Sequence, residues 1–136
     1  MKLASLVLLL AGAAFAADSP LVGTWEGEVN GHPAVRITIQ QNGDTLSGRI
    51  AFVFQERGPD GAWQVKDPNP EAGGMLAVKV NGKSIRFEVQ HHKQHGGTEF
   101  GPNVPFRVDV TGENEARLFK LDEGDPGQGL KLTRRK

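Results

Sequence analysis

Apolar and polar residues alternate one by one along most of this chain, and this alternation constrains the fold more than any other feature. Residues 35–39, 85–89 and 104–110 carry apolar side chains at every second position, with polar, charged or proline residues between them. A period of two gives a strand one dry face and one wet face, which is typical of antiparallel sheets. Helix-period stretches are absent after the N-terminal segment. We therefore predict an all-β fold.

Eight strands are predicted from this pattern and from the turn residues between them. They are expected at residues 21–29, 33–41, 45–55, 75–80, 84–91, 104–111, 115–121 and 128–134. Trp63 and Val65 follow a Gly-Pro-Asp-Gly turn and are interpreted as a short hairpin extension of the third strand. An even number of strands lets the last strand run antiparallel to the first, and closure removes unpaired edges. We expect an eight-stranded antiparallel up-and-down β-barrel.

The predicted connections are of two lengths. Tight turns are expected at Asn42-Gly43, Asn81-Gly82 and residues 111–114, and long connections rich in Pro and Gly at 56–74, 92–103 and 122–127. Asn-Gly pairs suit type I′ hairpins because both central residues need positive φ. Successive turns of a meander alternate between its ends. Short turns should therefore close one end, and the other end should carry the loops, where binding residues tend to lie.

The N-terminus has the parts of a secretory signal peptide. Lys2 precedes an apolar run over residues 3–15, and Ala14-Phe15-Ala16 has the small-x-small form of a cleavage site. The run is shorter than the roughly 20 apolar residues that a membrane span needs. We predict a signal peptide over residues 1–16 and one exported domain over residues 17–136, periplasmic or secreted, with no integral membrane segment after cleavage.

Composition limits the partners and the source of stability. Without residues 1–16 the 136-residue chain keeps 120 residues, which is ordinary for one domain with one core. It has no cysteine, so no disulfide stabilises it. Loss of Lys2 changes 16 basic and 16 acidic residues to 15 and 16, a net charge near −1. Such a balance gives no long-range attraction to nucleic acid or to anionic lipid.

The start of the first predicted strand carries a short motif. Gly23-Thr24-Trp25 resembles the G-x-W pattern found at this place in lipocalins and related calycin barrels, and small exported bacterial proteins of this barrel type are similar. The resemblance implies that an arginine of the last strand lies over this tryptophan. Arg134 shares a face with the apolar residues of that strand. Trp25 and Arg134 are thus expected to form a structural latch at the closed end.

The resemblance extends in part to avidin-type barrels. Thr45-Leu46-Ser47-Gly48 follows the next tight turn, and this also resembles the start of avidin-type barrels. Avidins hold biotin with a tyrosine and several tryptophans. This chain has no tyrosine, and its other tryptophan, Trp63, lies in the predicted extension. Biotin binding is not expected.

The inward-facing positions predict an apolar lumen with polar groups only at its mouth. The expected ligand-binding residues are Phe52, Phe54, Phe87, Val89, His91 and Phe106. Such a lumen suits a small apolar or amphipathic ligand, with His91 binding its polar head. Side chains alone can also fill an eight-stranded barrel. In that alternative the protein is a ligand-free structural or interaction module with an exposed apolar patch.

A second alternative is a divalent metal site. All four histidines are expected at the loop-bearing end, and imidazoles from nearby positions can hold zinc. His91 and His95 are the preferred ligands, with His32 third. The competing interpretation of residues 91–95 is a solvated loop. Residues 67–71 carry alternate oxygens, but Ala72 stands where a calcium loop needs glycine, so calcium is not expected.

An enzyme is not expected from this sequence. The chain has no cysteine nucleophile, no G-x-S-x-G motif and no phosphate-binding loop. Ser47 is predicted on the outer face, away from every histidine, so a Ser–His pair would require another register. Glu26 and Glu28 also alternate outward and are interpreted as solvated. No catalytic residue is assigned.

Overall fold

The computed structural model describes residues 18–135 apart from residues 69, 91–98, 123 and 126. Its strands are β1 (Gly23–Val29), β2 (His32–Asn42), β3 (Thr45–Phe52), β4 (Gln55–Arg57), β5 (Trp63–Val65), β6 (Gly73–Gly74), β7 (Leu76–Asn81), β8 (Ser84–Val89), β9 (Val104–Gly112), β10 (Glu115–Lys120) and β11 (Leu130–Arg135). Within these residues, no helix has the length and apolar character needed to cross a bilayer. The all-β prediction is confirmed.

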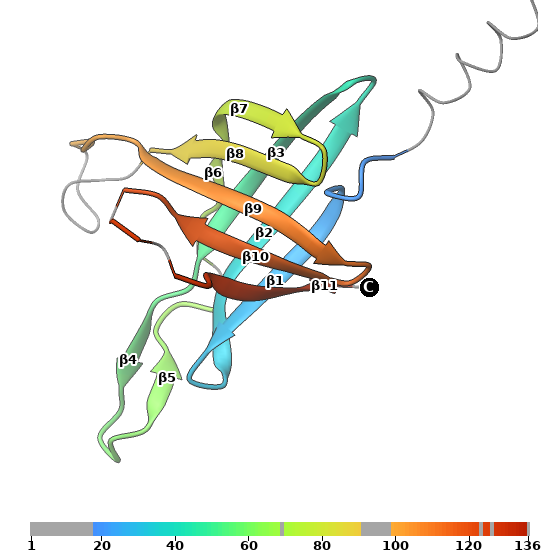
Figure 1. The fold of residues 1–136 in the computed structure, drawn as a ribbon. Coiled ribbons are helices and arrows are strands. Elements are labelled where there is room, and N and C mark those ends of the chain that lie inside the picture. The colour runs from blue at the N-terminus through green and yellow to red at the C-terminus, as the bar shows by residue number, and fades with distance from the viewer. Residues whose placement is uncertain (1–17, 69, 91–98, 123, 126, 136) are drawn as a thin grey trace, which may run out of the picture.

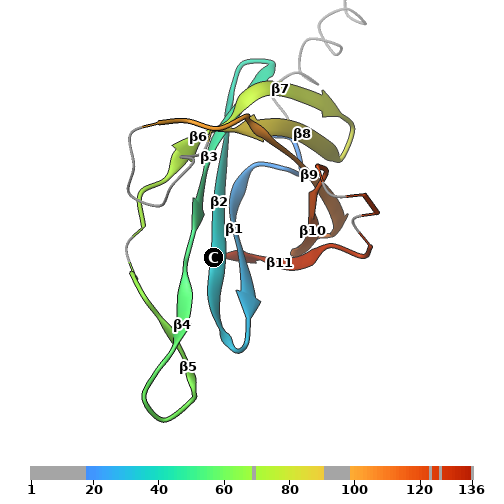
Figure 2. The same cartoon turned by 90° about the vertical axis from the view of Figure 1, so that its left-hand side faces the viewer.

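The strands form one large sheet and one small one. Nine strands follow the order β6-β3-β2-β1-β11-β10-β9-β8-β7, all antiparallel, and curl into a nearly closed barrel (Figures 1 and 2). The first and last long strands pair, with Trp25 opposite Arg134. This pairing confirms the prediction that the last strand returns antiparallel to the first.

The sheet has nine strands and not the predicted eight, because residues 73–74, which were expected in the long connection 56–74, form the additional short strand β6. β6 pairs with β3, whereas β7 pairs with β8 on the other side of the seam. Between them the Met75 amide donates to the Gly48 carbonyl at 2.9 Å. Ala77 has φ of 50° and lies in a bulge between Leu76 and Lys79, which bends the strand. One segment therefore lines both edges of the seam.

The two ends of the barrel differ as the sequence predicted. We call the end with the short connections the turn end; it carries residues 42–45, 81–84 and 112–115. We call the opposite end the loop end; it carries the turn 29–32, the hairpin of β4 and β5, and the described parts of the connections after β8 and β10. β1 begins at the turn end, so Trp25 lies near it, whereas β2 begins at the loop end with His32.

Inward-facing side chains of the long strands make the core. The buried set contains Leu21, Trp25, Val35, Ile37, Ile39, Ile50, Ile85, Phe87, Val89, Phe106, Val108, Ala116, Leu118 and Leu132. The ring of Phe87 stacks on that of Phe106, with 5.9 Å between centroids, and Phe52 lies 5.5 Å from Phe106. Phe87 is fully buried. These aromatic rings occupy the interior of the described part of the barrel.

A hairpin of β4 and β5 projects beyond the barrel at the loop end (Figures 1 and 2). This confirms the predicted extension, but it corrects the placement of Phe54, which is 52% exposed and not in the lumen. β3 ends at Phe52. The Phe54 carbonyl then accepts a bond from the Lys66 amide, so Phe54 belongs to the base of the hairpin.

Candidate functional site

The turn end holds the predicted contact between Trp25 and Arg134. The guanidinium carbon lies 4.2 Å from the centre of the indole ring, and the indole Nε1 donates to the Leu21 carbonyl at 3.0 Å. Arg134 also donates to the carbonyls of Pro20 at 2.8 Å, of Val22, and of Glu113 at 3.1 Å. The side chain thereby joins the segment before β1 to the turn between β9 and β10.

The surroundings of Gly23 explain why the G-x-W motif begins with glycine. A Cβ atom at this position would lie 2.6 Å from Nη1 of Arg134. Gly23 also has φ of 135°, a backbone conformation that residues with a Cβ atom rarely adopt. The glycine therefore leaves the space that the guanidinium occupies above Trp25. These residues form a structural contact between the first and last long strands.

The residues predicted for a lumen site are not brought together around an open cavity. Phe87, Val89 and Phe106 are buried in the core. Phe52 packs partly buried against them, and Phe54 lies outside. His91 lies outside the described residues. Two pockets in the described part of the chain are both lined mainly by side chains of the outer face or of the connections.

The predicted metal ligands are only partly described. His32 is the first residue of β2 and lies at the loop end. His91 and His95 fall outside the described residues. Among the residues that are described, no group of three or more His, Cys, Asp or Glu side chains could hold a metal ion. Zinc binding through these three histidines stays a prediction.

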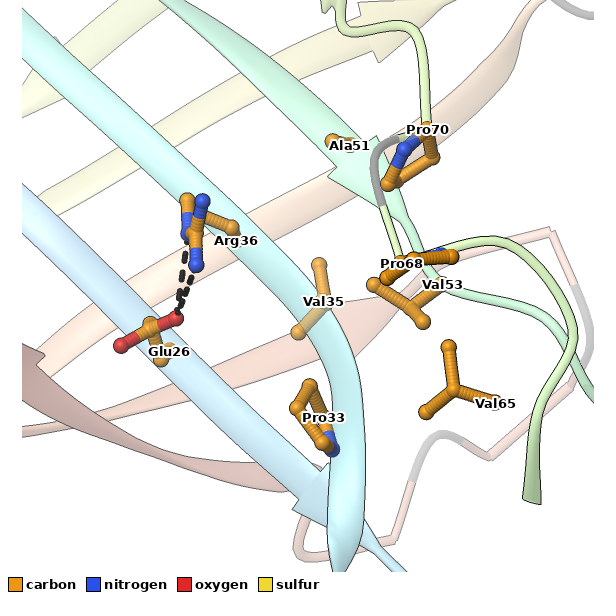
Figure 3. A pocket seen from close by; sticks show the side chains of 9 residues that line it. All are labelled: Glu26, Pro33, Val35, Arg36, Ala51, Val53, Val65, Pro68 and Pro70. Atoms are coloured by element: carbon orange, nitrogen blue, oxygen red, sulfur yellow. Dashed lines mark hydrogen bonds and ion pairs between the residues drawn. The ribbon is translucent and has the colours of Figure 1, made fainter.

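The more apolar of these two surface depressions lies on the outer face of β1, β2 and β3 (Figure 3). Glu26, Arg36 and Ala51 lie in one row across these strands, because Glu26 is opposite Arg36 and Arg36 is opposite Ala51. Arg36 is exposed, as an outward position requires, whereas Ala51 is only 9% exposed. An outward alanine with so little exposure must be covered by another part of the chain.

The cover is the segment that leads from β5 back to β6. We call residues 66–68 and 70–72 the proline segment. Nη2 of Arg49, on the outer face of β3, donates to the Ala72 carbonyl at 2.7 Å and attaches this segment to the barrel. The space between them has a volume of about 250 Å³. It is lined by Glu26, Pro33, Val35, Arg36, Ala51, Val53, Val65, Pro68 and Pro70. We call this space the proline pocket.

One edge of the proline pocket is charged and the rest is apolar. Arg36 donates through Nε at 3.0 Å and through Nη2 at 2.9 Å to the same oxygen, Oε2 of Glu26. The other oxygen of Glu26 lies 3.6 Å from Nε of Arg135. The Arg36 side chain is 51% exposed, so its ion pair with Glu26 adds little to stability. The pair instead fixes the position of the guanidinium at the pocket edge.

The second pocket lies at the bend of β7. It is lined by Ala77, Lys79, Arg86, Phe87, Glu88 and Pro105. Three of these residues are charged, and none of them comes from a segment folded over the sheet. The proline pocket combines more apolar surface with a cover, and is therefore the better candidate for a ligand site.

The sequence reasoning did not find the proline pocket. Residues 67–71 are predicted in a long connection without a calcium site, and Glu26 is predicted on the outer face. Neither prediction brings the two segments together. The available signal was Ala51, a small apolar residue at an outward position between Arg49 and Val53. Such a residue indicates that something lies against the sheet.

Comparison of this chain with protein-family models, with curated proteins and with solved structures finds no match. The fold and the site therefore define the class of the protein by themselves. It is an all-β protein built on a nearly closed antiparallel barrel, with an apolar pocket on the outer face beneath a proline-rich connection.

Proposed function

We propose that this protein is an exported, lipocalin-like barrel that binds a small apolar or amphipathic molecule in the proline pocket. The observation that carries the proposal is an apolar space of about 250 Å³ that is already formed and has one charged edge. Ligand sites are usually concave and mostly apolar, with a few fixed polar groups. The usual volumes begin near 300 Å³, so the ligand is expected to be small.

Proline residues make the pocket suitable for binding. Pro33, Pro68 and Pro70 form a large part of its wall. A proline side chain loses almost no conformational freedom when a ligand covers it. Binding to such a wall therefore avoids much of the ordering that weakens association elsewhere. This preorganisation favours a ligand site over an incidental surface depression.

A pocket-filling variant tests the proposal. The neutral probe 1-octanol is titrated into the protein, and backbone amide shifts are followed by NMR. We expect the largest shifts at Ala51, Val53 and Val65, and a loss of at least about tenfold in affinity for Ala51→Phe, a difference of about 1.4 kcal/mol. Ser47→Phe is the matched control, because Ser47 is an exposed outward residue of the same strand.

Two outcomes would overturn the proposal. One is an unchanged affinity in Ala51→Phe. The other is a set of shifts centred on Val89 and Phe106, which would return the site to the barrel interior.

The projecting hairpin supports a second candidate, an interaction module. Trp63 is 37% exposed, and the guanidinium carbon of Arg57 lies 4.8 Å from the centre of its indole ring. Val29, at the base of the hairpin, is 44% exposed, and its carbonyl accepts a bond from Gln55. Large exposed aromatic residues are enriched at protein interfaces.

Cross-linking of the native exported fraction tests the interaction module. If the hairpin binds a partner, the Trp63→Ala variant should lose the cross-linked species that the unaltered protein forms. Gln64→Ala, on the same strand, is the control, because it removes a polar side chain and leaves the indole in place. Identical cross-linking patterns for both variants would reject the hairpin as a partner site.

A further inference from the structure

We infer that the ligand of the proline pocket is a small amphipathic monocarboxylate, whose carboxylate is bound by Arg36. This inference rests on the proposed function, since it specifies the ligand of the same pocket. Three features support it: unused donors on Arg36, the charge of the pocket edge, and the apolar wall beside it.

Arg36 has donors that its protein partners do not use. A guanidinium carries five N–H donors in a planar fork. The bonds from Arg36 to described residues are those from Nε and Nη2, and both go to one oxygen of Glu26. Nη1 donates no such bond within the described part of the chain. A carboxylate accepts from this kind of fork in a bidentate manner, which a neutral hydroxyl cannot do.

The charge of the pocket edge favours one added negative charge. Glu26 lies between two arginines, with Oε2 at 2.9 Å from Nη2 of Arg36 and Oε1 at 3.6 Å from Nε of Arg135. Among the residues that line the pocket, Glu26 and Arg36 are the charged ones; Arg135, Asp67 and Glu71 do not line it. Because the Glu26 carboxylate is shared between two guanidinium groups, it neutralises Arg36 only in part, and this edge favours an added negative charge over a positive one.

The apolar wall distinguishes an amphipathic acid from an inorganic anion. Val53, Val65 and Pro68 come from three different parts of the connection after β3, and with Pro33 and Pro70 they surround the space beside Arg36 (Figure 3). A hydrocarbon tail buried against this wall gains about 25 cal/mol for each Å² of apolar surface removed from water. Phosphate or sulfate would leave the wall uncovered. The geometry therefore selects a carboxylate with a short apolar tail.

A matched pair of probes tests the inference. Octanoate and 1-octanol have the same chain length and differ in the charge of the polar end. Each probe is titrated into the unaltered protein and into the Arg36→Gln and Arg117→Gln variants, and the backbone amide shifts are measured. Arg117 is an outward residue of β10 and controls for the loss of one positive charge. Arg36→Lys is added, because it keeps the charge and loses the planar fork.

The unaltered protein should bind octanoate about tenfold more tightly than octanol, since a charge-assisted bond at a half-exposed site contributes about 1.5 kcal/mol. Arg36→Gln should remove that preference, so that octanoate binds no more tightly than octanol. Arg36→Lys should restore only part of it, and Arg117→Gln should change neither ligand. The preference should also weaken as salt is raised, because the charged edge is exposed.

The failures of the two proposals are distinguishable. If octanol and octanoate bind equally to the unaltered protein at the pocket residues, the monocarboxylate inference is wrong and the pocket stands. If Arg36→Gln weakens both probes equally, Arg36 shapes the pocket and does not select the charge, which also overturns the inference. If neither probe shifts the pocket residues, the proposed function fails and the inference fails with it.

Discussion

Replacing Arg134 by alanine should destabilise the barrel more than any other substitution of an exposed or half-buried charged residue at the turn end. The side chain makes three hydrogen bonds to main-chain carbonyls, and its guanidinium lies 4.2 Å from the centre of the Trp25 ring. Two of the carbonyls belong to the segment before β1 and one to the turn before β10. The substitution therefore releases contacts that close the sheet between its first and last strands.

The expected loss can be worked from these contacts. Bonds from a charged donor contribute about 1.5–3 kcal/mol when buried, but Arg134 is half-buried and the freed carbonyls regain water, so about 0.5–1 kcal/mol each is appropriate. The cation–π contact adds about 0.5–1 kcal/mol. The sum is about 2–4 kcal/mol, against a total stability of about 5–15 kcal/mol for an ordinary domain. The melting temperature should fall by about 10 °C.

Urea unfolding followed by tryptophan fluorescence measures this loss, since Trp25 is fully buried and reports the barrel directly. Arg135→Ala is the matched control: Arg135 is the next residue of β11 and makes an exposed pair with Glu26 at 3.6 Å. It should lose less than about 1 kcal/mol. Arg134→Lys should recover less than half of the loss, because an ammonium cannot reach three carbonyls at once. If Arg134→Ala and Arg135→Ala unfold at the same urea concentration, the reasoning is refuted.

Three further substitutions test the packing of the barrel. Gly48→Ala should lower the free energy of unfolding by about 1–3 kcal/mol in urea titrations, because its Cβ would lie 2.5 Å from the Thr38 carbonyl oxygen and 2.9 Å from the Met75 sulfur; an unchanged midpoint would contradict the close crossing at the seam. Phe87→Ala should lower it by about 3–5 kcal/mol if the interior is filled, and a loss under 1 kcal/mol would instead indicate an open lumen. Trp63→Ala should change the midpoint by less than about 1 kcal/mol, since the hairpin projects from the core; a larger loss would show that β4 and β5 are part of the cooperative unit.

Alternation and turn chemistry were sufficient to predict the strand layout and the two ends of the barrel. Both are local properties: side-chain alternation sets the face of each residue, and Asn-Gly pairs set the tight turns. The pairing of Trp25 with Arg134 followed from the resemblance together with the antiparallel return of the last strand. The bend at Met75 was not predicted, because it depends on which two strands the segment must join. Neither Met75 nor Ala77 carries a local signal for it.

The position of the candidate site was harder to predict, because it depends on volumes and on where a long connection folds back. Alternation predicts which aromatic residues face inward, but it does not give the volume that their rings leave free. In the structure the rings of Phe52, Phe87 and Phe106 pack against one another, and their contacts use the space.

The long connection after β3 forms a pocket with the outer face of the sheet. Its prolines cannot join the sheet as central strand residues, since they lack an amide donor. They are left to cover the outer face, where Ala51 makes room for them and Arg49 holds the main chain in place. A connection too proline-rich to extend the sheet is thus a part of the chain that can form a pocket with the outer face. We therefore expect the proposed ligand beside Arg36, outside the barrel wall, and not among the packed rings of Phe52, Phe87 and Phe106.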